Sequence, residues 1–428
     1  MSPPRSPALL KRELERLEDE RLAPAAARSA EAKRRHPSLD EGRLRHYRTE
    51  FQHDRDRILH SRAFRRLKDK TQVVSPASGD HHRTRLTHAL EAAQVARTAS
   101  RALALNEDLA EAVAMGLNLG ASPFGAEGEA VLASLLGGDE RAPGYARAWQ
   151  GLRVVDLLEK RYAYAGLNLC HEVREGILKS HSFWPEDGEL DLRALGRGQA
   201  PSLEAQLAHA ADRLVAIVHD LEDGLRAGLI NLRAVERLGA AREVARFLGA
   251  SLAAPRENYL RGNQLVRGML HLFVAGLIEH TGVSLAGWCE DLGVSDHTGF
   301  RTHRDKLPAG LAALPTASAA LAAEAEDFVR SALGNSAAVR ERAGQARRIL
   351  SALYKLYCDD PRLLPDYSLF AFRDRSRRRY LRDLKPGEAA GEIERHYAAS
   401  PLFHRTLGDF LSGMSDRYAR DEYARLTA

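Results

Sequence analysis

Apolar residues recur every three to four positions along most of the chain, which is the spacing of one face of an α-helix. The pattern predicts helices over residues 7–21, 51–73, 86–105, 107–119, 127–136, 145–160, 168–180, 203–226, 256–282, 320–333 and 338–358. Neither alternating strand patterns nor a short repeat accompanies them, so the sequence predicts an all-α fold. Residues 185–202 and 293–316 are expected to be long surface connections.

The stretch Met115 to Glu129, MGLNLGASPFGAEGE, predicts a tight turn between two helices. The first helix is expected to end at Gly120, and the second is expected to begin near Gly128. Glycine and proline at these points are typical helix stop and start signals. Asn106 is expected to cap the helix that leads into this turn. Such a frame is typical of a buried turn that holds catalytic side chains.

Composition indicates an ordinary soluble protein of 428 residues, 44% hydrophobic and 28% charged. The apolar runs are too short to span a membrane, and the N-terminus lacks the apolar core of a secretory signal. Cytoplasmic localisation without a membrane partner is therefore expected, with Cys170, Cys289 and Cys358 as reduced thiols. A pI near 9.1 and arginine clusters such as 373–383 favour a polyanionic partner, a nucleotide or a nucleic acid.

Two titratable residues stand out among apolar helical positions. Asp212 lies on an apolar helix face, and a buried carboxylate needs a partner, either a metal ion or an arginine such as Arg85 or Arg213. His88 is either a hydrogen-bonded core histidine or a metal ligand. His219 follows Asp212 by about two helical turns, a separation at which side chains rarely converge on one ion.

Six stretches carry a resemblance to a known family. They are HSRAFRRLKDKTQV at 60–73, GDHHRTRLTHALEAAQVAR at 79–97, LNLGASPFGAEGE at 117–129, GLNLCHEVREGILK at 166–179, AADRLVAIVHDLEDGLRAGL at 210–229 and GMSDRYARDEY at 413–423. With these six stretches in this order along the sequence, the chain resembles the bacterial dGTPase-like deoxynucleoside triphosphate triphosphohydrolases of the HD-domain superfamily. The resemblance implies an HD-domain helical bundle with a helical C-terminal extension. The expected parts are an N-terminal arm (1–50), a core (51–290) and a C-terminal region packed on it (291–428).

The resemblance also implies a divalent metal, Mg, Mn or Fe, held by a histidine, a His-Asp pair and a distant aspartate. Such an ion activates water and polarises the α-phosphate, so that a dNTP is cut into deoxynucleoside and triphosphate. The first and last ligands match His88 and Asp212, whereas Leu117 and Asn118 stand in place of the pair. Leucine has no donor atom, and an amide oxygen binds a divalent ion far more weakly than a carboxylate. Metal binding is therefore expected to be weak or absent.

Other positions of the family pattern are partly kept. The catalytic histidine falls on Ala126, its acidic partner matches Glu129, and a further Glu-His pair appears as Ala146-Arg147. The sugar-stacking tyrosine falls on Ala216. The resemblance implies substrate contacts from Gln72, Arg85, Arg213, Asp220, Asp416 and Tyr418.

These features favour a nucleotide- or anion-binding pseudoenzyme with lost or weak hydrolase activity and a regulatory or assembly role. Its partners would be a dNTP and further subunits, either copies of itself, for example in a hexamer, or an active paralogue. Two alternatives remain open. One is an active triphosphohydrolase with a rearranged site at His88, Asp212, Asn118 and Glu129. The other is a structural protein that binds nucleic acid through its basic surface.

Overall fold

The computed structural model describes residues 10–37, 47–72, 83–137, 144–181, 184 and 188–428 of the chain. Within these ranges the protein is helical and has no β-strand, only two isolated β-bridges. The all-α fold predicted from the sequence is confirmed. The stretch 75–80, SPASGD, whose proline and glycine predict a loop, lies outside the described residues.

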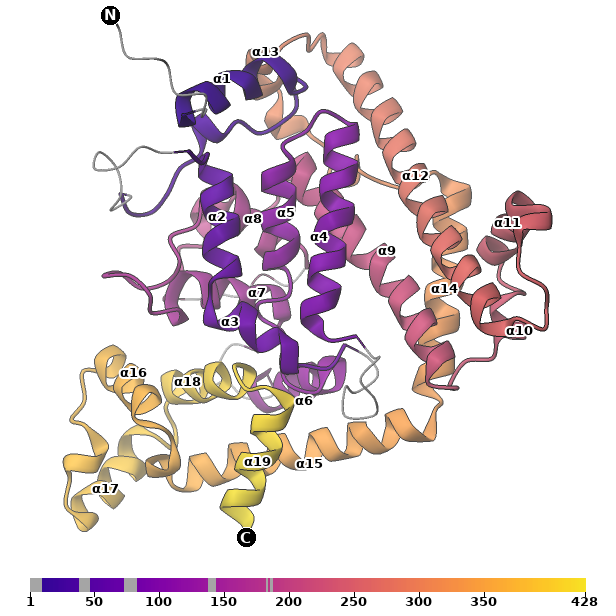
Figure 1. Ribbon diagram of the computed structural model, residues 1–428. Coiled ribbons are helices and arrows are strands. Elements are labelled where there is room, and N and C mark those ends of the chain that lie inside the picture. The colour runs from indigo at the N-terminus through magenta and orange to yellow at the C-terminus, as the bar shows by residue number, and fades with distance from the viewer. Residues whose placement is uncertain (1–9, 38–46, 73–82, 138–143, 182–183, 185–187) are drawn as a thin grey trace, which may run out of the picture.

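A bundle of helices forms the central part of the molecule (Figure 1). Its members are α2 (Glu50–Leu59), α3 (Arg62–Arg66), α4 (Arg85–Ala102), α5 (Glu107–Gly116), α7 (Arg147–Arg153), α8 (His171–Leu178) and α9 (Leu203–Arg226). They enclose an apolar core in which small residues of α4 and α5 allow close helix packing. Asn106 caps α5 as predicted, since its side chain accepts a hydrogen bond from the Leu109 amide.

A second layer of helices lies along the outer side of α9. It contains α10 (Leu232–Val235), α11 (Gly239–Leu248), α12 (Asn258–Leu292), α13 (His297–Thr302) and α14 (Thr316–Gly334). By length and composition alone α12 could cross a membrane. Its residues Leu265, Met269 and Phe273 are buried, and the helix packs on α9 and α11. In this structure α12 is therefore a helix of the second layer, although the sequence analysis expected no apolar run of this length.

The C-terminal helices form a third apolar cluster together with α6 (Gly125–Gly137) at one end of the bundle (Figure 1). They are α15 (Ala337–Asp359), α16 (Asp366–Ser376), α17 (Pro386–His396), α18 (Pro401–Ser412) and α19 (Asp416–Thr427). At the opposite end, α1 (Lys11–Arg21) leads into a segment that contacts α13, where His297 Nδ1 lies 2.9 Å from the Pro24 carbonyl oxygen. The predicted boundaries at residues 50 and 290 stay a prediction.

Several local features differ from the helix pattern predicted from the sequence, and three of them have a local cause. The predicted helix 51–73 is interrupted at His60, because Ser61 caps a new helix by accepting a hydrogen bond from the Phe64 amide. The predicted helix 145–160 ends in a π-helical turn at Val154–Leu158. The connection 293–316 contains the short helix α13, which Asp296 caps. In each case a side-chain cap or a local change of helix type overrides the apolar periodicity.

Candidate functional site

The turn between α5 and α6 has the tight geometry that its glycines predict. A Cβ added to Gly120 would lie 2.1 Å from the Arg147 carbonyl oxygen, and one added to Gly128 would lie 1.8 Å from the Pro123 carbonyl oxygen. At both positions the neighbouring carbonyl oxygen is too close for any side chain. Phe124 and Gly125 both adopt φ of +64°, which is costly for the phenylalanine. The sequence thus keeps every glycine that this frame needs.

Asp416, the first residue of α19, holds this turn to the C-terminal helices. Its carboxylate accepts a hydrogen bond from the Phe124 amide at 2.8 Å and others from the amide and hydroxyl of Thr71. Lys70 adds two more links by donating to the carbonyl oxygens of Ala121 and Ser412. Sequence similarity predicted Asp416 as a substrate contact, whereas in this structure its carboxylate is used to position the turn.

His88 from α4 and Asp212 from α9 meet as the sequence predicts. His88 Nε2 lies 3.0 Å from Asp212 Oδ1, and the Asn118 amide donates to the same oxygen at 3.1 Å. Burial alone would raise the pKa of Asp212, but His88, Arg147 and the Asn118 amide together lower it well below its usual range. Burial lowers the pKa of His88 although Asp212 opposes that change. Asp212 is therefore an anion held by hydrogen bonds.

The other side of His88 continues into a chain of hydrogen bonds. His88 Nδ1 lies 3.1 Å from His219 Nδ1, and His219 Nε2 lies 2.8 Å from Glu91 Oε2. Burial would raise the pKa of Glu91, but His219 and Arg83 lower it to about 2. Each of these contacts, and the one to Asp212, needs one proton. His88 and His219 thus join the carboxylates of Asp212 and Glu91 in one row of contacts.

These residues do not fit the divalent metal that the resemblance implies. Its two remaining ligand atoms, on His88 and Asp212, contact each other, and Asn118 presents its amide nitrogen to the carboxylate. Leu117 is buried in the apolar core and offers no donor. In the described part of the chain there is no group of three or more histidine, cysteine, aspartate or glutamate side chains arranged to hold a metal. His219 binds Glu91 and His88 instead of completing a new site.

Two arginines share the site with these carboxylates. Arg147 Nε lies 3.5 Å from Glu129 Oε1, and Glu129, followed by Asp212, raises the pKa of Arg147. Arg85 is buried and its Nη1 lies 3.5 Å from Asn118 Oδ1. Burial and the nearby Arg147 lower the pKa of Arg85, while Glu129 and Asp212 raise it. Fixed positive charge therefore occupies the region beside the altered metal ligands.

Four polar atoms at predicted site positions are buried and have no hydrogen-bond partner among the described residues. They are Gln72 Oε1, Arg85 Nε, Glu129 Oε1 and Asp220 Oδ1. Burial raises the pKa of Asp220 to about 7, although Arg85 opposes it. An unsatisfied buried polar atom costs about 1–3 kcal/mol, so several at one place point to a ligand or water that satisfies them.

Two predicted substrate contacts lie away from this group. Arg213 is exposed and pairs with Glu326 of α14, with Nη2 2.6 Å from Oε2. Tyr418 lines a different cavity, next to α16 and α18. Ala126, at the expected position of the catalytic histidine, is exposed on α6. The sequence analysis noted Arg147 only as the residue that replaces a histidine of the family pattern, and it did not identify Lys70 or Glu91. Glu91 follows His88 by three residues and so lies near it on the same helix, which was the available signal.

In this all-α bundle α4 supplies a histidine, the turn after α5 supplies an asparagine, and α9 supplies an aspartate to one place. This arrangement defines an HD-type helical protein with an altered ligand set. No family model matches the chain. Curated relatives named deoxyguanosinetriphosphate triphosphohydrolase-like protein do match it. The relative from Bordetella pertussis is 40% identical over 89% of this chain and 90% of its own length. The relative from Ralstonia pickettii is 37% identical over 95% of this chain and 95% of its own length. The relative from Deinococcus radiodurans, which carries the same name followed by the number 1, is 37% identical over 97% of this chain and 98% of its own length.

The chain therefore belongs to the deoxyguanosinetriphosphate triphosphohydrolase-like family. The resemblance read from the sequence is confirmed at this level.

Proposed function

We propose that this protein binds a nucleoside triphosphate, of the dNTP class, without metal-dependent hydrolysis, and acts as a regulatory or assembly member of its family. The observation that carries the proposal is the group of unsatisfied buried atoms of Gln72, Arg85, Glu129 and Asp220 beside a metal centre that lacks half of its donors. Some substrate positions of the family pattern are kept, whereas half of the ligand set is not. Such a site supports recognition of the substrate but not activation of water by a metal.

Arg85 and Arg147 are the residues proposed to contact the triphosphate. Guanidinium groups donate paired hydrogen bonds to phosphate oxygens and stay charged at all accessible pH. Glu129 and Asp212 attract these two cations. An incoming phosphate would compete for the same donors, so binding is expected to loosen the contact between Arg147 and Glu129. Asp220, with a pKa of about 7, repels phosphate less than an ordinary aspartate would.

The altered set of donor atoms is the reason why the proposal includes no metal-dependent step. A metal ion would need His88 and Asp212 to give up their mutual contact, and Leu117 supplies nothing in return. The alternative of an active enzyme with a rearranged site would need Asn118 and Glu129 as ligands. The Asn118 amide nitrogen already donates to Asp212, and Glu129 makes only a long ion pair with Arg147.

Assembly with further subunits belongs to the same proposal. Large apolar side chains lie exposed on α11 and α12, with Phe247 85%, Val283 73% and Tyr259 69% accessible. Large exposed apolar residues on these helices support association with another protein surface. A copy of this chain and an active paralogue remain the two candidate partners. The proposal also places the protein in the cytoplasm, as expected for a protein that binds dNTPs.

A paired experiment tests the proposal. Differential scanning fluorimetry with each of the four dNTPs in EDTA measures binding without metal, because a ligand of the native state raises the melting temperature. A triphosphate-release assay with Mg²⁺, Mn²⁺ or Fe²⁺ measures hydrolysis. The proposal predicts a dNTP-dependent rise in melting temperature in EDTA and no release above the buffer control. Stabilisation that requires metal, or rapid release of triphosphate, would contradict it.

A further inference from the structure

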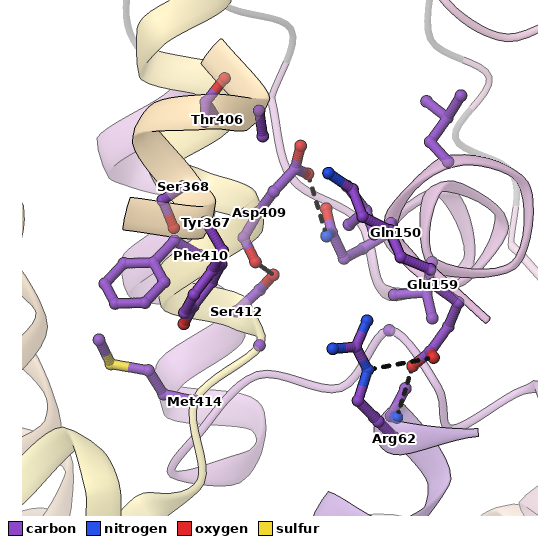
Figure 2. Close-up of a pocket in the computed structure, with 18 of the residues that line it drawn as sticks. Arg62, Gln150, Glu159, Tyr367, Ser368, Thr406, Asp409, Phe410, Ser412 and Met414 are labelled. Atoms are coloured by element: carbon purple, nitrogen blue, oxygen red, sulfur yellow. Dashed lines mark hydrogen bonds and ion pairs between the residues drawn. The ribbon is translucent and has the colours of Figure 1, made fainter. Parts of the chain in front are cut away.

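A cavity opens beside the candidate site, between the core and the C-terminal helices, and Lys70 and Gly120 of the turn are among the residues that line it. Its volume is about 600 Å³, and it lies between α3, α7 with its π-helical turn, α16 and α18 (Figure 2). None of His88, Asn118, Glu129 and Asp212 lines it. We call it the C-terminal cavity. Pockets of about 300–1,000 Å³ are of the size that holds a small organic ligand.

The walls of the C-terminal cavity are largely apolar. Val154, Leu157 and Leu158 form the side contributed by the π-helical turn. The rings of Tyr367 and Phe410, on α16 and α18, form the facing side, with their centroids 6.0 Å apart in an edge-to-face arrangement (Figure 2). Two aromatic rings opposite an aliphatic wall favour a flat, apolar ligand body, since such rings gain from edge or face contact with another ring.

The acidic groups deeper in the cavity are already neutralised by the protein itself. Asp409 accepts from Arg153, with Nη2 2.7 Å from Oδ2, and from Gln150. Glu189 pairs with Arg375 and Arg153. These pairs leave little free negative charge to attract a cationic ligand.

The rim beside α3 carries an excess of positive charge. Arg62 has only a long ion pair, 3.6 Å from Glu159, whose other oxygen accepts from the Ala63 amide. Arg66 makes no hydrogen bond or ion pair with the part of the chain that the structure describes, and Lys160 makes none through its side chain. The side chains of Arg62, Arg66 and Lys160 all line the cavity. An anionic group at this rim would find guanidinium groups that make only a long ion pair or none, within reach of the apolar interior.

We infer that the C-terminal cavity binds a small aromatic anion, with its ring between the Leu157 wall and the Tyr367–Phe410 wall and its carboxylate or phosphate at Arg62 and Arg66. The protein thus has two sites for anions, one at Arg85 and Arg147 and one here. The second does not depend on the proposed function of the first. The ligand chemistry follows from the apolar body of the cavity together with its cationic rim.

The test uses the full-length protein and two fluorescent probes with the same fused ring. The probes are 1-anilinonaphthalene-8-sulfonate, an aromatic anion, and N-phenyl-1-naphthylamine, which lacks the sulfonate. Saturable binding of the anionic probe is expected, and Arg66→Glu should weaken it at least about fivefold, as a local charge reversal does. Arg65→Glu, the same change at an exposed neighbour that does not line the cavity, should leave it within about twofold. Binding of the neutral probe should not distinguish the two variants.

A cavity-filling variant provides the second arm. Ala371 of α16 lines the cavity, so Ala371→Trp should abolish saturable binding of both probes while circular dichroism shows an intact helical fold. Stabilisation by dATP should be unchanged in Ala371→Trp and Arg66→Glu, which separates this inference from the proposed nucleotide site. Equal weakening by Arg65→Glu and Arg66→Glu, or undiminished probe binding in Ala371→Trp, would overturn the inference.

Discussion

His88 Nε2 lies 3.0 Å from Asp212 Oδ1, so the two surviving members of the family's metal set contact each other directly. The Asn118 amide reinforces this contact by donating to the same carboxylate oxygen. Leu117, the neighbouring replacement, packs into the core. With leucine and asparagine at the other two expected ligand positions, this place holds a hydrogen-bonded group instead of an open coordination site.

Restoring the missing ligands should restore metal binding. The triple variant Leu117→His, Asn118→Asp, Ala126→His supplies a four-donor set of nitrogen and carboxylate ligands, which suits Mn²⁺ or Fe²⁺. Without metal, the new carboxylate beside Asp212 should lower stability, because two close carboxylates repel each other. We expect close to one bound metal per chain by elemental analysis and a rise in melting temperature on adding Mn²⁺.

Ala126→His alone is the control for this variant, since the resemblance makes that histidine catalytic and not a ligand. It should bind no more metal than the unmodified protein. A triple variant that folds but gains no metal would show that Leu117 and Asn118 are not at the ligand positions.

Arg147 should matter for nucleotide affinity, whereas Arg213 should not. Arg147→Gln removes the charge that lies beside Glu129 and Asp212, and a charged hydrogen bond to phosphate is worth about 1.5–3 kcal/mol. The dATP affinity measured by isothermal titration calorimetry in EDTA should fall about tenfold or more. Arg213→Gln is the matched control, because Arg213 is exposed and paired with Glu326. Equal losses in both variants would favour the family's original contact pattern over the geometry of this structure.

Removing the charge of Asp416 should loosen the junction between the turn and the C-terminal helices. Asp416 accepts from the Phe124 amide and from the amide and hydroxyl of Thr71, all in a buried place. Asp416→Asn replaces one acceptor oxygen with a donor, which should lower the free energy of unfolding by about 2–3 kcal/mol. Asp421→Asn, an exposed aspartate on the same helix, should change it by less than about 0.5 kcal/mol in urea denaturation.

Much of this architecture could be predicted from the sequence because helix periodicity is a local property. Helix α9 was predicted with its observed ends. The turn was predicted in the right place from its glycine and proline residues, but α5 ends at Gly116 instead of Gly120 and α6 begins at Gly125 instead of near Gly128. Helix α12 extends ten residues beyond the predicted end at residue 282, since nothing in its composition marks that point as a stop. The breaks at Ser61 and Val154 depend on a side-chain cap and on packing, which periodicity does not report.

The candidate site could be predicted only at positions where a single residue matches the family pattern. His88, Asp212 and Asn118 come together as their place in the family pattern requires. The direction of Arg213 could not be predicted, because adjacent helical residues point about 100° apart and only tertiary packing shows which side faces the site. The pairing of His219 with Glu91 joins two different helices, so spacing along the chain gave no direct evidence of it.

The buried lysine beneath the turn should make stability depend on pH above neutrality. Burial lowers the pKa of Lys70 to about 7, and Arg66 and Arg85 act in the same direction while Asp416 and Glu129 oppose them. Between pH 7 and about 10.5 the unfolded chain therefore binds a proton at Lys70 that the folded chain does not. The contribution of Lys70 to the free energy of unfolding should rise with pH across this window, by up to about 1.4 kcal/mol per pH unit. Below pH 7 the lysine is charged in both states and its contribution should be constant.

Lys70→Met removes this titration while keeping an unbranched side chain of similar length. The difference in unfolding free energy between the two proteins, from urea titrations at pH 6, 7, 8 and 9, should shift in favour of the lysine protein as pH rises. Lys68→Met is the control, because Lys68 is exposed on the same segment and should show no such shift. A difference that stays constant from pH 6 to pH 9 would mean that Lys70 keeps its proton in the folded state, held by the Ala121 and Ser412 carbonyl oxygens.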